Sequence, residues 1–205
     1  MGIQRGLQNR FYDYDRPSQK IVIAAIDEKT LRPEALGPLR EWSRENYAQA
    51  IEVLNEAGAA AIGIDITFPD AGPDDDAFAE TLKTHSNVAL AARYYFENGK
   101  RQAELPNSTI LNAQPKLGWI NVKQDEDGFV RELPVFAEGP DGSMDMDAFA
   151  IAVVRKAEQT EPLEYRLIDG QFPYAPGVSI PVTTRRDGKE EVNLMYINYF
   201  AEPGR

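Results

Sequence analysis

The chain has 205 residues, of which 22 are basic and 33 are acidic, so its formal net charge is −11. This balance argues against nucleic acid and against anionic lipid headgroups as partners, because both attract basic patches. The chain contains no cysteine, which excludes disulfides, thiol catalysis and thiolate metal ligands. With 42% hydrophobic residues, it is apolar enough to fold around a sizeable core.

Residues 1–19 mix arginine, tyrosine and aspartate and contain no run of apolar residues like that of a signal peptide. We interpret them as a lead-in arm to the first strand. The aromatic and aliphatic side chains of residues 7–17 predict that the arm packs against the domain rather than hanging free. We also expect the C-terminal strand, 191–200, to run near this arm.

Two apolar runs in the first third of the chain predict strands over residues 20–27 and 60–66. Aspartates mark their carboxyl ends, Asp27 in the first run and Asp65 in the second. Between them, apolar residues at helical spacing predict a helix over residues 43–57. A strand, a helix and a second buried strand in this order are typical of a βαβ unit with parallel strands.

A second helix is predicted over residues 74–85 and a third strand over 87–96, followed by a tight turn at Asn98-Gly99. We expect the three strands to pair in parallel at the centre of one sheet, with the two helices as crossovers. In the C-terminal half the pattern predicts a hairpin whose turn is DEDG at 125–128, a helix over 145–158 and a β-rich final segment. The predicted fold class is therefore α/β, with a central, mostly parallel sheet extended by antiparallel hairpins in the C-terminal half.

Motifs for catalysis or phosphate binding are absent. Neither a P-loop nor a G-x-G-x-x-G motif follows the first strand, and there is no G-x-S-x-G motif. The single histidine, His85, is best interpreted as a residue at the end of a predicted helix. The acidic residues at 70–76 are better interpreted as helix-capping residues and solvated turn charges than as a calcium or magnesium site. The sequence therefore indicates no cofactor and no metal.

The aspartates at the strand ends are the most informative polar residues. Adjacent parallel strands lie about 5 Å apart, so we expect Asp27 and Asp65 to approach each other or to share an arginine. One interpretation is that each caps its loop or pairs with Arg44, Arg93 or Arg131. The other is a small-molecule or ion pocket at the carboxyl edge of the sheet, where ligands of such folds bind.

An ordered series of motifs carries a family resemblance. It runs through LQNRFYDYDRP, VIAAIDEKTL, GPLREWSRENYAQAIEVLNEAGAAAIGIDITFPD, DDDAFAETL, GWINVKQDEDGFVREL, MDMDAFAIAVVRKA and YINYFAEPGR. In this order the motifs resemble the type-two CHASE domain, an extracellular sensory module of bacterial cyclases and histidine kinases. The chain departs from the family at REWSR, where the family more often places a proline between two tryptophans.

The resemblance implies an extracytoplasmic sensor domain of a bacterial transmembrane receptor, without catalytic residues of its own. Residues 1–19 would follow a membrane helix, residues 20–205 would form the sensor, truncated at its C-terminus, and a cyclase, kinase or diguanylate cyclase would provide the output. The partners would be an unidentified small molecule or ion, the membrane through flanking helices, and a second copy in the full-length receptor, with no nucleic acid.

The candidate ligand-binding residues come from the strand ends and the predicted elements beside them rather than from the resemblance. They are Asp27, Asp65, Arg93, Trp42, Arg44 and Arg131. Two other functions stay open. One is a small metal-dependent α/β hydrolase that uses Asp27, Asp65 and the acids at 70–76, and the other is a non-catalytic surface interaction module.

Overall fold

The computed structural model describes residues 20–122, 124–137, 146–162, 164–187 and 190–197. The predicted lead-in arm and the last residues of the predicted strand 191–200 lie outside these ranges. The expected packing of the arm, and its proximity to the C-terminal strand, therefore stay predictions.

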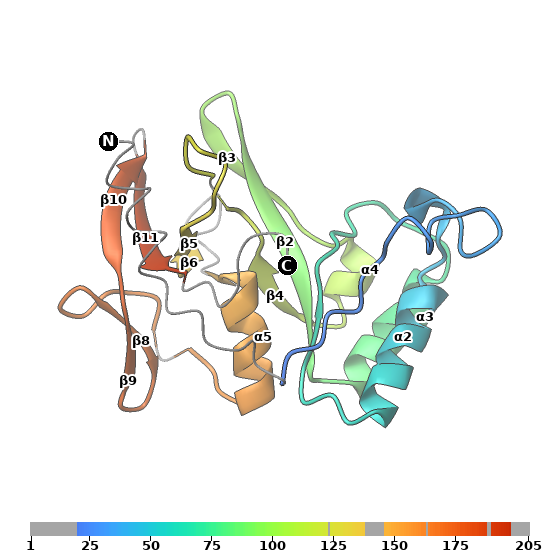
Figure 1. Ribbon diagram of the computed structural model, residues 1–205. Coiled ribbons are helices and arrows are strands. Elements are labelled where there is room, and N and C mark those ends of the chain that lie inside the picture. The colour runs from blue at the N-terminus through green and yellow to red at the C-terminus, as the bar shows by residue number, and fades with distance from the viewer. Residues whose placement is uncertain (1–19, 123, 138–145, 163, 188–189, 198–205) are drawn as a thin grey trace.

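A four-stranded sheet forms the centre of the described chain (Figure 1). Its middle strand, β2 (Val88–Glu97), pairs in parallel with β1 (Ile62–Ile64) on one side and with β4 (Lys116–Trp119) on the other. After β2 the chain turns back at Asn98 and Gly99, both at positive φ. It continues as β3 (Lys100–Glu104), which pairs antiparallel with the C-terminal half of β2. The Asn-Gly pair suits this turn because both central residues must adopt positive φ.

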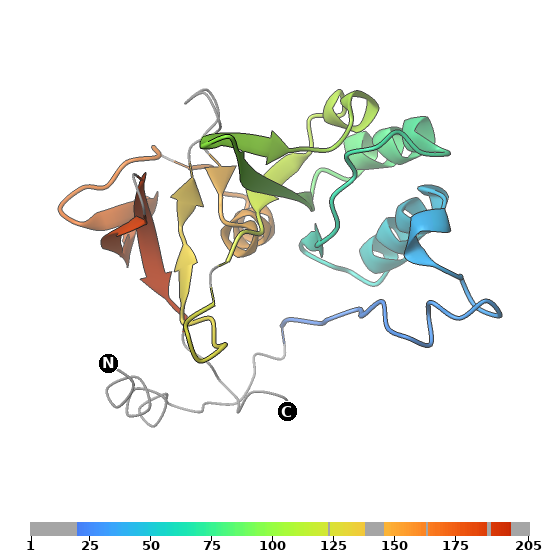
Figure 2. The same cartoon turned by 90° about the horizontal axis from the view of Figure 1, so that it is seen from above.

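Helices cover both faces of the sheet (Figures 1 and 2). On one face lie α2 (Glu45–Glu56), α3 (Asp75–Thr84) and the short α4 (Ser108–Leu111), and a 3-10 turn, η1 (Leu39–Glu41), precedes α2. Between these helices and the sheet, the largest core cluster includes the fully buried Ile51, Phe78 and Leu90. α5 (Phe149–Glu158) packs on the opposite face.

The sheet accepts α5 because glycines stand at the points of contact. A Cβ added at Gly118 on β4 would come within 2.6 Å of the Phe149 Cα and 3.0 Å of the Ala152 Cβ. On β1, a Cβ at Gly63 would meet the Val153 Cγ2 at 2.7 Å. The neighbour of Gly118 is backbone, which cannot swing away, whereas the neighbour of Gly63 is a side-chain methyl group.

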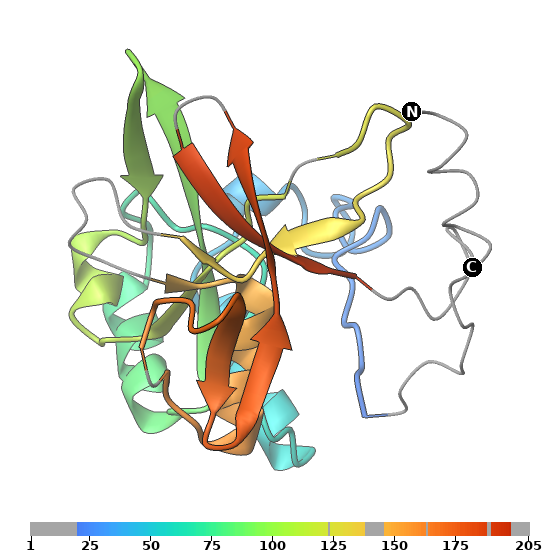
Figure 3. The ribbon, with the colours of Figure 1, turned by 90° about the vertical axis from the view of Figure 1, so that its left-hand side faces the viewer.

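The C-terminal part consists of short antiparallel pairs (Figure 3). The pairs are β6 (Phe136–Ala137) with β7 (Met146–Asp147), β8 (Gln171–Ala175) with β9 (Val178–Pro181), and β10 (Thr183–Asp187) with β11 (Glu190–Tyr196), which also pairs β5 (Glu132–Pro134). Their apolar side chains form a second cluster with α5, in which Val135 and Phe172 are fully buried.

The predicted fold class is confirmed: the structure is α/β, with parallel strands at its centre and antiparallel hairpins in the C-terminal half. The predicted strands at 60–66 and 87–96 and the helices at 43–57, 74–85 and 145–158 appear as β1, β2, α2, α3 and α5, most of them shorter than expected.

Two predicted elements are wrong. Residues 20–27 do not form a strand in the central sheet but run as extended, exposed backbone. The third parallel strand is instead β4, which was expected to pair in a hairpin with the segment after 125–128. The turn itself forms, since the Gly128 N–H donates to the Asp125 carbonyl at 2.9 Å. The segments that flank it separate, however, because β4 pairs β2 whereas β5 pairs β11.

The contact between Gly118 and α5 gives a test of this packing. We expect Gly118→Ala to lower the free energy of unfolding by about 1–3 kcal/mol, the usual cost of overpacking a tight contact. Gly63→Ala is the matched control and should cost less, because the Val153 side chain can rotate. Urea denaturation of both variants measures the difference, and an equal or larger loss for Gly63→Ala would contradict the packing described.

Candidate functional site

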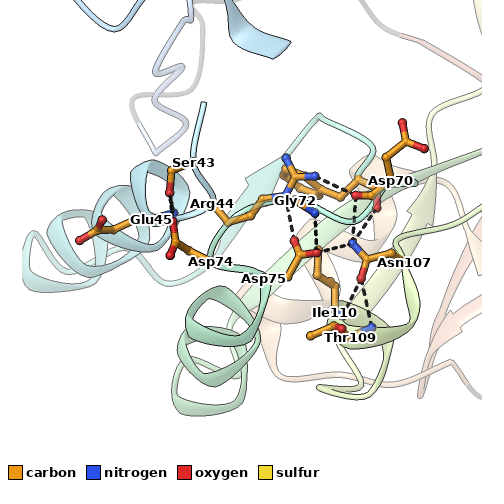
Figure 4. A network of polar contacts seen from close by, with 11 residues as sticks. Ser43, Arg44, Glu45, Asp70, Gly72, Asp74, Asp75, Asn107, Thr109 and Ile110 are labelled. Atoms are coloured by element: carbon orange, nitrogen blue, oxygen red, sulfur yellow. Dashed lines mark hydrogen bonds and ion pairs between the residues drawn. The ribbon is translucent and has the colours of Figure 1, made fainter. Parts of the chain in front are cut away.

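The loop that follows β1 runs along the carboxyl edge of the parallel strands and leads into α3 at Asp75. This edge is where open α/β sheets bind ligands. Contacts to the start of α2 and to the segment before α4 hold the loop in place (Figure 4). A further contact joins it to the end of β3. We treat this loop, residues 65–75, and its contacts as the candidate site and call it the rim loop.

Arg44, at the start of α2, makes the central contact. Its Nε lies 3.0 Å from the Asp75 Oδ1, and one of its terminal nitrogens donates to the Asp70 carbonyl at 3.0 Å. The guanidinium also stacks over the Phe68 ring, 4.8 Å from its centroid. The Asp75 side chain is 8% exposed and that of Arg44 15% exposed, so the ion pair is largely shielded from water. One arginine thus joins α2, the rim loop and α3.

Asn107 completes the network from the other side. Its side-chain amide donates to the Asp75 Oδ2 at 3.0 Å and to the Asp70 carbonyl at 3.2 Å, while its backbone N–H donates to the Phe68 carbonyl at 2.8 Å. Its side-chain oxygen accepts from the backbone N–H of Thr109 and so caps α4. Asn107 therefore fixes the rim loop and starts α4 with the same side chain.

The backbone of Gly72 and the side chains of Ser43 and Asp74 are also engaged. The Gly72 N–H donates to the Asp75 Oδ2 at 2.8 Å, which gives this carboxylate partners on both of its oxygens. At the entry to α2, the Ser43 hydroxyl donates to the Asp74 carboxylate and accepts the Glu45 N–H. Ser43 therefore links the start of α2 to the start of α3.

Arg93 lies at the other end of the rim loop, on β2. It donates from two nitrogens to Glu104 on β3, at 2.7 and 2.6 Å, and Glu104 also accepts the Thr67 hydroxyl at 2.9 Å. These hydrogen bonds, led by those from Arg93, hold the pKa of Glu104 below its usual value. The pair is therefore ionised at neutral pH and attaches the loop to the hairpin of β2 and β3.

Trp42 stands next to this network as part of the core. It is 7% exposed, and its indole N–H donates to the Gly37 carbonyl at 3.0 Å. Its ring lies 5.8 Å from Tyr47, which packs edge-on against Phe68 at 5.0 Å. Trp42 thus supports the ring on which Arg44 stacks, but its buried indole offers no free donor.

The two aspartates do not meet. Asp27 closes a local turn, in which its Oδ1 accepts the N–H groups of Lys29 and Thr30 and the Thr30 hydroxyl, each at 3.0 Å. These bonds, above all those from Thr30, lower the pKa of Asp27. Asp65 is exposed on the rim loop, and within the described part of the chain it contacts neither Asp27 nor an arginine. The predicted pairing is wrong, because residues 20–27 lie outside the sheet.

Arg131 also lies apart from the rim loop. It is 5% exposed and binds Asp125 at 2.7 Å and Asp127 at 2.8 Å across the turn that the sequence predicted. Its hydrogen bonds lower the pKa of Asp127 to about 2. The candidate residues therefore divide into three places: Trp42, Arg44, Asp65 and Arg93 along the rim loop, Asp27 in its own turn, and Arg131 in the 125–131 turn.

The chemistry of the rim loop is that of a binding or positioning surface. Arg44 and Asn107 satisfy Asp75, and Arg93 and Thr67 satisfy Glu104. None of these groups is placed as a nucleophile next to a base. Among the described residues, no three histidine or acidic side chains converge as metal ligands. Asp65 and Asp70 present exposed side chains at the edge of the loop. The hydrolase alternative finds no assembled pair of carboxylates here.

Sequence reasoning found Arg44 and Arg93 but missed their partners. Asp75 belonged to an acidic run, Asp74 to Asp76, that was interpreted as a helix cap, and only burial distinguishes it from its neighbours. Asn107 and Glu104 fall in a stretch without periodic pattern. The one available signal for Asn107 was its position directly before a short helix, where asparagine is a favoured cap.

Comparison with known families adds the decisive observation. The family model described as the CHASE2 domain matches residues 1–204. The chain belongs to the CHASE2 domain family. No significant match to a curated protein or to a solved structure was found. CHASE2 domains are sensory domains of bacterial receptors, so the match agrees with the resemblance that the motifs showed.

The ion pair of Arg44 and Asp75 can be tested against a neighbouring acid. We expect Asp75→Ala to lower the free energy of unfolding by about 2–4 kcal/mol, because it leaves a mostly buried guanidinium without its partner. Asp76→Ala is the control: it removes an exposed carboxylate from the same first helical turn and should cost less than about 1 kcal/mol. Similar losses in urea denaturation would contradict the central position of this pair.

The contact between Arg93 and Glu104 predicts a pH dependence. Since the pKa of Glu104 is lowered in the folded state, its contribution is present above its unfolded value of 4.5 and is lost as pH falls through the folded value. The melting temperature of Glu104→Gln should therefore lie below that of the wild type at pH 7 and approach it below about pH 4.5. Glu97→Gln, a substitution at an exposed residue of β2, is the control, and its melting temperature should follow that of the wild type at every pH. A Glu104→Gln deficit that is constant down to pH 3 would contradict the assignment.

Proposed function

We propose that this CHASE2 domain is the extracytoplasmic stimulus-sensing domain of a bacterial transmembrane signalling receptor. The observation that carries the proposal is the family match over residues 1–204. The domain itself would be non-catalytic, and a cyclase, histidine kinase or diguanylate cyclase in the same polypeptide would produce the output. Within the described ranges, no helix is long and apolar enough to cross a membrane. The proposal places the membrane helices in flanking segments, as the resemblance to the family implies.

We propose the rim loop as the surface that meets the stimulus, a small molecule or an ion. Three features support it. The loop lies at the carboxyl ends of β1 and β2, and it carries the exposed carboxylates of Asp65 and Asp70. Arg44 connects it to α2, and the hydrogen bond from Thr67 to Glu104, the partner of Arg93, connects it to the β2–β3 hairpin. A ligand here would act by favouring one arrangement of these contacts over another. Asp27 and Arg131 lie outside this surface and are engaged in turns of their own.

A topology experiment tests the receptor proposal. Ala60, exposed before β1, is replaced by cysteine in the full-length natural protein, in a background without other reactive cysteines. A membrane-impermeant maleimide should label Ala60→Cys in intact bacteria as completely as in lysed cells. A cysteine placed in the output domain should be labelled only after lysis. Labelling of Ala60→Cys that requires lysis would overturn the extracytoplasmic assignment.

The rim loop predicts how variants change signalling. In the same full-length protein, Asp75→Asn should shift the basal output of the receptor by several-fold, because it weakens the contact to Arg44 while keeping the shape of the side chain. The exposed substitution Asp76→Asn serves as the control and should leave output at the wild-type level. Output is measured as cyclic nucleotide or phosphorylated partner per receptor. An unchanged output for Asp75→Asn, with folded protein at wild-type abundance, would contradict a role of the loop in signalling.

A further inference from the structure

Helices α2 and α3 lie side by side and are joined at both ends (Figure 1). At their N-terminal ends Arg44 contacts Asp75. At their C-terminal ends the Nε2 atom of His85, the residue that caps α3, lies 3.0 Å from the Oε2 atom of Glu52 on α2. Because the starts of the helices meet and their ends meet, the two helices run in parallel. Their C-terminal ends therefore lie together.

This C-terminal end of the helix pair is rich in negative charge. The last carbonyl groups of each helix carry a partial negative charge, which favours a cation nearby. α2 has no basic residue in its last turn, and Glu52 and Glu56 lie in its C-terminal half. The last turn of α3 has one basic residue, Lys83, which pairs with Glu80 at 2.6 Å. A positive charge on the His85 ring is therefore favoured by Glu52 and by both helix ends.

The other elements beside His85 add no charge. α4, which packs against α3, contains only uncharged residues. The loop of residues 57–61 and the two residues that lead from His85 to β2 are uncharged too. One of these two, Asn87, donates to the Asn55 side chain at 2.9 Å and to the Ala59 carbonyl at 3.0 Å, and amide contacts of this kind do not change with pH. Within the described chain, His85 is thus the group at this end whose charge can change near neutral pH.

The His85 ring is partly shielded from water. Its side chain is 20% exposed, whereas that of Glu52 is 52% exposed. The backbone N–H of His85 donates to the Thr81 carbonyl at 2.9 Å, which fixes the residue at the end of α3. A neutral ring can still donate a hydrogen bond to a carboxylate, but a bond that involves ionised groups is roughly twice as strong as a neutral one. The strength of this contact between the helices therefore depends on whether both ring nitrogens carry a proton.

We propose that the His85–Glu52 pair is a pH-sensitive contact, in which uptake of one proton by the His85 ring joins the C-terminal ends of α2 and α3 more firmly. Histidine is the side chain that ordinarily changes its charge between about pH 5 and 8, and the chain contains only one. The Arg44–Asp75 contact at the other end needs no proton, so acidification in this range acts on the C-terminal end. The inference does not depend on the proposed receptor function, since it concerns only contacts within this chain.

Thermal stability measured against pH tests the contact in the complete chain. A contact that requires the protonated ring is fully present at low pH and is lost as pH rises and the ring releases its proton. We expect His85→Gln, whose amide cannot take up this proton, to melt about 1–4 °C below the wild type at pH 5.5 and within about 1 °C of it at pH 7.5. A difference that is equal at both pH values would overturn the proposal.

Two exposed glutamates of α2 provide matched variants. Glu52→Gln removes the partner of His85, whereas Glu56→Gln removes a carboxylate one turn further along that does not contact His85 within the described chain. Measured against the wild type, Glu52→Gln should lower the melting temperature at pH 5.5 but not at pH 7.5. Glu56→Gln should give the same offset at both pH values. The same pH dependence in both variants would overturn the assignment of Glu52 as the partner.

The double variant His85→Gln/Glu52→Gln tests whether the two side chains act on each other. If they do, its loss of melting temperature at pH 5.5 should be close to that of either single variant, because each of these already removes the contact. A loss equal to the sum of the two single losses would show that the side chains act independently and would overturn the proposal.

Hydrogen exchange locates the effect at the helix ends. At pH 5.5 the backbone N–H of His85 should exchange about two- to fivefold more slowly in the wild type than in Glu52→Gln, and at pH 7.5 the two rates should be equal. Comparing the two proteins at the same pH cancels the chemical dependence of exchange on pH. Equal rates at pH 5.5 would overturn the proposed contact, whatever the melting temperatures.

Discussion

The ion pair between Arg44 and Asp75 is the constraint on which the first half of the structure depends. One guanidinium contacts Asp75 at the start of α3, the Asp70 carbonyl and the Phe68 ring, and Asn107 reaches the same carboxylate from the segment before α4. Removing one partner would leave a charge in a site that excludes most water, which costs far more than an exposed ion pair contributes. The rim loop is therefore fixed by a few side chains rather than by secondary structure.

The second half of the structure repeats this device. Arg155 on α5 is 1% exposed, binds Asp147 at 2.9 Å and the Tyr174 carbonyl at 2.6 Å, and stacks over the Tyr174 ring. Lys116 on β4 lies 3.5 Å from the same carboxylate. The pair thereby joins α5 to β7, β8 and the central sheet. In both halves an arginine that stacks on an aromatic ring connects elements far apart in the sequence, which suits its planar, multiply donating side chain.

Periodicity predicted the parts of the fold that depend on local pattern. β1, β2 and the helices α2, α3 and α5 were found because their apolar residues repeat with the period of the element. The pairing of β4 was missed, since a short run such as KLGW carries no sign of whether its partner is β2 or a later strand. Asp75 and Asp147 were missed for a related reason. A carboxylate becomes a buried partner only through the tertiary contact that brings an arginine to it.

The position of these contacts bears on how a sensor of this kind can respond. Asp75 already has partners on both oxygens, so a ligand that replaced Arg44 would have to compensate a desolvated charge. Asp65 and Asp70 are exposed and their carboxylates are unengaged within the described chain, so a ligand can bind them at little cost. In the proposed sensor, the stimulus therefore acts first on the outer side of the rim loop. The network of Arg44, Asp75 and Asn107 would then carry a shift of that loop to α2, α3 and α4, which pack as one body on the sheet.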